Sequence, residues 1–132
     1  MCIKEFTMTN CLDFYRCDIC GNIVQVLHSG EGDLVCCGQP MIYLQPQTTA
    51  DEKKEKHVPV FINENLVQVG TELHPMIKEH HIEFIEAVSP DRKNIQIKFL
   101  DIEHLPQMNL NQVEYNKLFE YCNLHGLWVG GE

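Results

Sequence analysis

Apolar and polar residues alternate along several short runs in the second half of the chain. In the run IQIKFL, the residues Ile95, Ile97 and Phe99 would share one face of an extended strand, and the polar residues between them the other face. Runs of similar character are HVPVFI at 57–62, LVQVG at 66–70 and HIEFIEAV at 81–88. Short polar connections separate these runs, and no long helical pattern lies among them, so they predict an antiparallel β-sandwich.

The segment NQVEYNKLFEYC, at residues 111–122, fits two interpretations. Its apolar residues could belong to a further strand of the sandwich. Leu118, Tyr121 and Cys122 would also lie on one face of a helix. The pattern alone leaves this choice open.

The first forty or so residues differ in kind, because short strands and turns surround clustered cysteines there. Glycines interrupt the segment repeatedly, and its few large apolar residues cannot offset the conformational entropy lost on folding. We therefore expect a small module at 1–44 that needs a staple. The polar stretch QPQTTADEKKE indicates a linker at 45–56, followed by the sandwich domain at 57–132.

Charge and chain length restrict the classes of partner. The 132 residues suit one medium domain or a domain with a small appendage, and 19 acidic against 10 basic residues give a net charge of −9. Such an acidic chain is not expected to bind nucleic acid. No run has the length of a signal peptide's apolar region or of a membrane span, so we expect a soluble protein of a reducing cytoplasm.

Four of the seven cysteines have the spacing of a metal site. Cys17 and Cys20 form a Cys-x-x-Cys pair, and Cys36 and Cys37 follow side by side. In a reducing compartment such clusters are more often metal ligands or redox groups than disulfides, and four thiolates can close a tetrahedron around zinc or iron. A thioredoxin-like redox pair lacks its βαβ context here, and buried thiols are the remaining alternative. Two adjacent ligands require the backbone to bend.

Near the C-terminus, the stretch YCNLHGLW contains Cys122 and His125 with two residues between them. A cysteine in such a stretch is either a buried thiol or a ligand that shares an ion with the histidine. The stretch alone does not decide between these interpretations.

Four stretches together resemble a known family, the desulfoferrodoxins or two-iron superoxide reductases. In chain order they are YRCDICGNIVQVLHSGEGDLVCCGQPM, EKHVPV, HPMIKEHHIEFIE and YCNLHGLW. The resemblance covers nearly the whole chain from Tyr15 onward. It implies a mainly β protein, with a small desulforedoxin-like iron-binding module followed by an immunoglobulin-like antiparallel β-sandwich.

The resemblance also implies two iron ions per chain. The four-cysteine group would hold the first iron. The ligands implied for the second are His57, His74, His80, Cys122 and His125.

Several positions depart from the family or lie outside its motifs. His81 stands where the family usually has an aromatic residue, and His80 is chosen as the ligand because its spacing from His74 follows the family. Leu127 replaces a residue that is often histidine or polar. We interpret the remaining cysteines and histidines as incidental side chains; they are Cys2, Cys11, His28 and His104.

The activity that the resemblance implies is one-electron reduction of superoxide to hydrogen peroxide. Lys56 is the expected attractor of the anion, and Glu55 is expected to occupy the sixth iron position after oxidation. The electron donor would be rubredoxin or a similar small protein, and the family suggests a homodimer. Backbone N–H groups of Leu124 and His125 are expected to hydrogen-bond the sulfur of Cys122.

Two other functions remain open on the residues themselves. A zinc-stapled β-sandwich could serve as a non-catalytic binding module, and a two-iron electron carrier would need no substrate. Colour separates zinc from ferric thiolate sites, and small anions would bind only where a coordination position is open.

Overall fold

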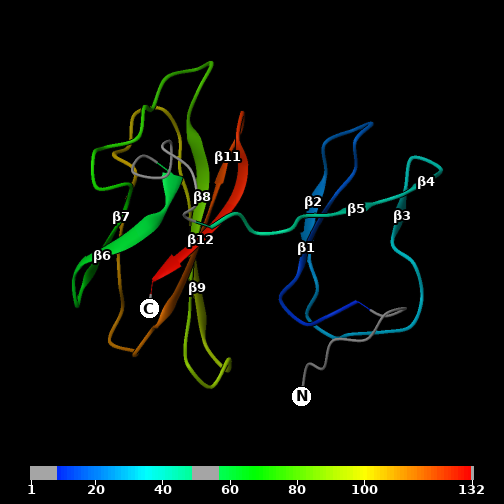
Figure 1. Ribbon diagram of the computed structural model, residues 1–132, viewed down its shortest axis with the longest axis horizontal. Coiled ribbons are helices and arrows are strands. Elements are labelled where there is room, and N and C mark those ends of the chain that lie inside the picture. Colours follow the sequence, from blue (N-terminus) through cyan, green and yellow to red (C-terminus); the bar gives the residue numbers. More distant parts are fainter. Residues whose placement is uncertain (1–8, 49–56, 132) are drawn as a thin grey trace. The chain divides into compact units, whose positions relative to one another are not determined.

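The computed structural model describes residues 9–48 and 57–131. The chain divides into two compact units, Met1–Gln45 and Pro46–Glu132 (Figure 1). All 12 named elements are β-strands, which confirms the prediction of a mainly β protein. Among the described residues, no helix is long and apolar enough to cross a membrane.

The first unit is built from five very short strands. Strand β1 (Phe14–Arg16) lies between β2 (Ile23–Gln25) and β5 (Ile42–Tyr43), and both pairings are antiparallel. Strands β3 (Val35–Cys36) and β4 (Gln39–Pro40) form a separate hairpin. The buried apolar side chains described in this unit are Phe14, Cys17 and Val26. So small a core agrees with the expectation that the unit needs a staple.

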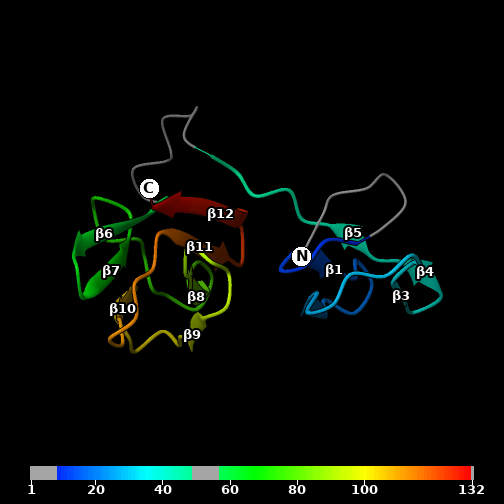
Figure 2. The same cartoon turned by 90° about the horizontal axis from the view of Figure 1, so that it is seen from below.

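The second unit contains two antiparallel sheets, of three and four strands. The first has the order β10 (Gln107–Asn109), β7 (Leu66–Val69), β6 (Pro59–Asn63). The order in the second is β12 (Gly126–Gly131), β11 (Lys117–Cys122), β8 (Ile82–Val88), β9 (Ile95–Phe99). Figure 2 shows β6, β7 and β10 along one side of this unit and the other four strands along the opposite side. Three plus four antiparallel strands make the predicted immunoglobulin-like sandwich.

The four alternating runs of the sequence appear as β6, β7, β8 and β9, as predicted. The ambiguous segment at 111–122 forms strand β11 over its second half. Its neighbours on both sides are strands, since it pairs with β8 and β12. Tertiary pairing therefore selects the strand over the helix.

Side chains from both sheets meet in one core. Val67 and Met108 come from the three-stranded sheet, and Ile85, Leu118 and Cys122 from the four-stranded sheet. All five are almost completely buried. The sulfur of Cys122 thus belongs to a strand that the core fixes in place.

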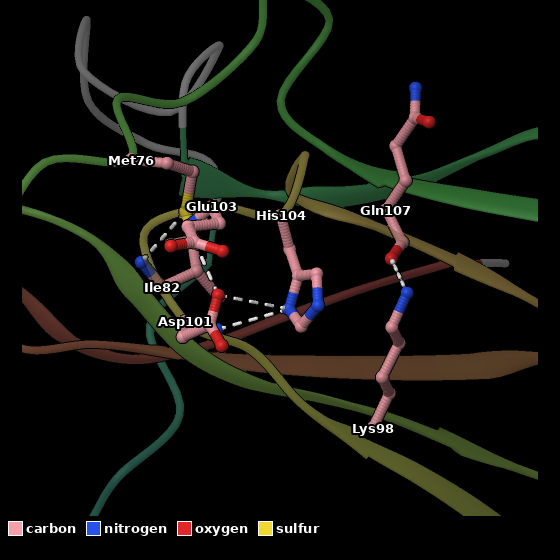
Figure 3. A network of polar contacts seen from close by, with 7 residues as sticks. All are labelled: Met76, Ile82, Lys98, Asp101, Glu103, His104 and Gln107. Carbon is pink, nitrogen blue, oxygen red and sulfur yellow. Dashed lines mark hydrogen bonds and ion pairs between the residues drawn. The ribbon is translucent and has the colours of Figure 1, made fainter.

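Strand β9 turns its polar face toward the other sheet. Gln96 Nε2 donates to the carbonyl of Asn109 at 2.7 Å, and Lys98 Nζ donates to the carbonyl of Gln107 at 3.3 Å (Figure 3). The apolar residues of β9 are consequently exposed, Phe99 most of all. The two faces match the predicted alternation. The polar face, however, is the one that turns inward and bonds β10 at the edge of the sandwich.

Candidate metal centres

The four cysteines of the first unit converge. The sulfur atoms of Cys17, Cys20, Cys36 and Cys37 all lie within 4.8 Å of one another. The Cys20 and Cys36 sulfurs are 3.6 Å apart, and those of Cys36 and Cys37 are 3.9 Å apart. Four soft donors so close together suit a tetrahedral zinc or iron ion.

A tight turn brings the two adjacent cysteines to one side. Cys36 pairs with Gln39 across the hairpin, so Cys37 and Gly38 are the two loop residues. Both have positive φ, 53° and 75°, as a type I′ turn requires. The turn supplies the backbone bend that two adjacent ligands need, and Gly38 adopts its left-handed conformation without the strain of a side chain.

Proton affinities differ strongly among these thiols. The pKa of Cys17 is lowered to about 6, chiefly because the backbone N–H of Cys20 donates to its sulfur at 3.5 Å. The pKa of Cys37 is raised to about 12, chiefly by hydrogen bonds with the side chains of Cys20 and Cys17. The cluster therefore favours one thiolate that accepts hydrogen bonds from its neighbours. A metal cation would replace the protons that these neighbours share.

In the second unit, four imidazole rings form a closed quadrilateral. The ring centroids of His57 and His74 are 4.9 Å apart, and those of His74 and His80 are 4.5 Å apart. His80 lies 4.9 Å from His125, and His125 lies 4.6 Å from His57. The diagonal from His57 to His80 is longer, at 6.1 Å. Four rings at the corners of such a figure can direct one nitrogen each toward a common centre.

The Cys122 sulfur adjoins this quadrilateral. It lies 3.8 Å from His125 Nδ1, and ligand atoms of His57, Cys122 and His125 lie within 4.8 Å of one another. Burial raises the pKa of the Cys122 thiol, while backbone hydrogen bonds from His125 and Leu124 lower it. The two amides therefore approach the sulfur as the sequence analysis expected. His57 belongs both to this group and to the group with His74 and His80.

The His74 ring has the protonation state of a metal ligand. Its Nδ1 lies 2.7 Å from the carbonyl of Pro75, which requires the proton on that nitrogen. Burial lowers the pKa of His74 to about 4, so the ring is neutral near pH 7. Its Nε2 is buried without a hydrogen-bond partner among the described residues. A buried lone pair of this kind fits a metal cation, as does the set of four imidazoles and one thiol.

Trp128 supports one side of the ring cluster. Its indole stacks on His57 at a centroid distance of 4.9 Å and an interplanar angle of 11°. The indole N–H donates to the carbonyl of His125 at 3.1 Å. Trp128 is almost fully buried, so it fixes two of the histidines and excludes water from the back of His57.

Comparisons with known proteins agree with both units. The family model described as "Desulfoferrodoxin, N-terminal domain" matches residues 9–44, and the model described as "Desulfoferrodoxin" matches residues 49–131. The chain belongs to the desulfoferrodoxin family.

The similarity to individual relatives covers most of the chain. A desulfoferrodoxin homologue of Archaeoglobus fulgidus is 44% identical over 128 residues, which cover 94% of this chain and 100% of the relative. A desulfoferrodoxin of Nitratidesulfovibrio vulgaris is 47% identical over 126 residues, with coverages of 92% and 97%. The crystal structure of the superoxide reductase from Treponema pallidum aligns with a TM-score of 0.68 and 26% identity, over 90% of this chain and 96% of that one.

Within this desulfoferrodoxin fold, the adjacent residues His80 and His81 have different surroundings. The His80 ring belongs to the quadrilateral. His81 is half-buried, and its Nδ1 lies 3.0 Å from the carbonyl of the exposed residue Ile77. His81 is absent from the ligand groups found among the described residues, so the geometry favours His80.

The other residues singled out from the sequence lie elsewhere. Glu55, Lys56 and Cys2 fall outside the described residues. His28 is exposed, and His104 is an exposed turn residue whose Nδ1 lies 3.4 Å from Asp101 Oδ1 (Figure 3).

Cys11 corrects one interpretation. It is disulfide-bonded in the structure and so is not an incidental thiol. The sequence analysis missed this because it assigned the cysteines outside the motifs no partner, and spacing does not reveal which thiols tertiary structure brings together.

Three polar residues that the sequence analysis did not select lie next to the proposed ligands of this desulfoferrodoxin. Gln47 Nε2 donates to the carbonyl of His125 at 2.6 Å. Both side-chain oxygens of Glu120 are buried without a hydrogen-bond partner in the described part of the chain, and burial raises its pKa well above the usual value. Asn123 follows Cys122 directly and hydrogen-bonds the segment around His80. Only their proximity in sequence to Cys122 could have indicated the last two.

Proposed function

We propose that the protein is a superoxide reductase that binds two iron ions. The convergence of four imidazole rings and one buried thiol carries this proposal. Family membership and the likeness to the Treponema pallidum superoxide reductase support it. In our assignment, residues 1–44 form the first iron module, 45–56 the linker and 57–132 the reductase domain.

The ligand set assigns one role to each group of side chains. His57, His74, His80 and His125 would hold the iron through one imidazole nitrogen each, and Cys122 through its thiolate. Five protein ligands leave one position of an octahedral ion open to a small anion. Iron bound there would supply one electron, and superoxide would take up that electron and two protons to leave as hydrogen peroxide.

Cys122 would control how readily the site gives up its electron. As an iron ligand, its thiolate would donate electron density to the metal, which would favour electron transfer to superoxide and departure of the product. The amides of Leu124 and His125 would moderate this donation through their hydrogen bonds to the sulfur. Burial of Cys122 within the core keeps the sulfur away from water and from dissolved oxidants.

Attraction of the substrate requires a local positive feature, because the chain carries a net charge of −9. Lys56 is the candidate for that feature, and Glu55 for the ligand that closes the sixth position after oxidation. Both residues immediately precede His57, a member of the ring quadrilateral. Lys56→Ala should slow the reaction of superoxide with the reduced protein without changing the iron content.

The remaining parts of the proposal concern the surroundings of the reaction. We assign the protein to the cytoplasm, with rubredoxin or a similar iron–sulfur protein as its electron donor. The four-cysteine group would hold the first iron, with Cys17, Cys20, Cys36 and Cys37 as its ligands. The active form would be a homodimer.

The experiment that tests the function is pulse radiolysis of the reduced protein, with hydrogen peroxide and dioxygen measured together. A reductase should consume superoxide and one electron from the protein for each peroxide formed, without releasing dioxygen. Dioxygen release in step with peroxide would indicate dismutation instead. A colourless zinc protein that leaves superoxide unchanged would favour the binding module, and a coloured iron protein without this reaction would favour the electron carrier.

A further inference from the structure

All four polar groups of the two peptide bonds that flank His80 form hydrogen bonds. His80 lies between two peptide bonds, which together offer two N–H donors and two carbonyl acceptors. Ile77 satisfies one group of each peptide: the His80 N–H donates to the Ile77 carbonyl at 3.1 Å, and the Ile77 N–H donates to the His80 carbonyl at 3.0 Å. The carbonyl of Glu79 and the N–H of His81 remain to be paired.

The side chain of Asn123 pairs both of these remaining groups. Its Oδ1 accepts from the His81 N–H at 2.8 Å, and its Nδ2 donates to the Glu79 carbonyl at 3.1 Å. An N–H can only donate and a carbonyl can only accept, so these partners fix the orientation of the amide. The backbone N–H of Asn123 adds a third bond, to the His81 carbonyl at 3.1 Å.

Asn123 is also attached directly to the thiol ligand. It follows Cys122, just after the register shift between Tyr121 and Cys122 in the pairing of β11 with β8, and it precedes His125 by two residues. One residue therefore links the Cys122–His125 turn to both peptides that flank His80. Displacement of this link would move the His80 ring relative to Cys122 and His125.

We propose that Asn123 is a positioning residue that holds His80 in register with Cys122 and His125 at the second metal centre. The inference rests on the proposed ligand set. Only a side chain with one donor and one acceptor at this length can pair both groups: aspartate keeps the acceptor alone, and alanine removes both. Groups that orient metal ligands in this way are worth about 10- to 100-fold in metal affinity.

The first test compares metal release from the holoprotein of the native chain, Asn123→Ala and Asn123→Asp. A chelator is added in excess, and the release phases are assigned with Cys36→Ser, which is expected to lack the first centre. We expect release from the second centre to be about 10- to 100-fold faster in both Asn123 variants. Release from the four-cysteine centre should stay unchanged and serves as the internal reference.

The matched control is Asn63→Ala. Asn63, the last residue of β6, also uses its Oδ1 to accept a backbone N–H, that of Asn65 at 2.8 Å in the turn to β7. It belongs to neither ligand group. Its loss should leave both release phases unchanged. Equal acceleration in Asn63→Ala and Asn123→Ala would overturn the inference, because any lost turn amide would then have the same effect.

A second readout follows hydrogen exchange of single amides in the same holoproteins. The His81 N–H should exchange faster in Asn123→Ala but remain protected in Asn123→Asp, which keeps the acceptor. Native release rates combined with native protection of His81 in Asn123→Ala would contradict the proposal. If the native protein fails to reduce superoxide and Asn123→Ala still releases metal faster, only the proposed function fails.

Discussion

The two units of this protein position their candidate metal ligands by different means. In the first unit, four cysteines lie on or next to very short strands, and few apolar side chains are buried around them. The second unit places its ligands around a two-sheet sandwich whose core contains Cys122 itself. The first arrangement needs a metal to hold the chain together, whereas the second has a fold that can hold a metal.

This difference separates structural from chemical roles of a ligand. A tetrahedron of four thiolates is closed by protein atoms, so that such a site is suited to stabilising a fold or passing electrons. Four imidazoles and one thiolate leave a position open in an octahedral ion, which suits reaction with a small anion. Loss of a ligand should therefore affect folding in the first unit and chemistry in the second.

The largest effect is expected for Cys122→Ser. A hydroxyl that stays mostly protonated replaces a soft thiolate, while four imidazoles can still bind the metal. Turnover should fall by more than about 100-fold, since loss of even an outer partner of a ligand costs about 10- to 100-fold. Pulse radiolysis of iron-loaded protein measures this rate.

The control for that experiment is the native protein at equal iron content in the second unit. Near-native turnover of iron-loaded Cys122→Ser would show that the thiolate does not drive the reaction. The contrast between the units would then rest on stability alone.

A loss of folding confined to one unit is expected for Cys36→Ser. The first unit should release its metal and lose hydrogen-exchange protection in β1, β2 and β5, because its small core cannot offset the entropy of folding. Superoxide reduction with an artificial donor should remain within about two-fold of native, since single ligand losses in the other unit are expected to cost far more. Metal loss from both centres would contradict the division into independent units.

A smaller effect is expected for Leu118→Ala. Leu118 is completely buried in the sandwich core, so that its truncation should lower the free energy of unfolding of this unit by about 2–5 kcal/mol. Denaturant unfolding followed by Trp128 fluorescence reports this unit alone, since the chain has one tryptophan. The visible absorption of an iron-loaded four-cysteine centre should be lost at the same denaturant concentration as in the native protein, because the two units are expected to be independent.

Val35→Ala is the matched control for Leu118→Ala. Val35 is an exposed apolar residue beside Cys36 in the first unit, and surface substitutions of this kind stay within about 0.5 kcal/mol. Equal losses of sandwich stability in the two variants would show that the loss does not come from truncation of a buried side chain in the sandwich core.

The smallest effect concerns acid and the connection between β8 and β9. Hydrogen bonds from the Ser89 hydroxyl at 2.7 Å and the Lys93 N–H at 3.0 Å lower the pKa of Asp91 in the folded state. The folded state therefore binds this proton less readily than the unfolded state. The resulting stabilisation is complete above about pH 4 and disappears as pH falls through the folded-state pKa.

Asp91→Asn should remove this contribution to the acid response. Thermal unfolding of the sandwich at a series of pH values below about 5 would measure it. The slope of stability against pH should be slightly shallower in Asp91→Asn than in the native protein. An identical slope would mean that the turn adds nothing to the acid response.

The sequence predicted the sandwich because apolar and polar residues alternate along its strands and so indicate the two faces of each strand. It could not predict which face of β9 turns inward, because Gln96 and Lys98 find their backbone partners only when β10 lies beside them. The strand β11 was ambiguous for a related reason. Its residues fit two periods, and pairing with β8 and β12 decides between them.

The two candidate metal centres also differ in how far the sequence could predict them. The spacing of the four cysteines indicates their site, since the two members of each pair are close in sequence. His57, His74 and His80 come from separate segments, so only the family resemblance suggested that they share a centre. Asn123 escaped notice because an asparagine beside a cysteine has no distinctive pattern, and its role emerges only from its bonds to Glu79 and His81.

The quadrilateral of histidines also sets a sequence of events during biosynthesis. Its members run from position 57 to position 125; Cys122 ends β11, and His125 lies between β11 and β12, which are made after the other described strands. Contacts between such distant segments form late in folding. The cysteines from 17 to 37 can meet as soon as the first unit has emerged. The four-cysteine cluster should thus be able to form before β11 and β12 have been made, and the quadrilateral of histidines only afterwards.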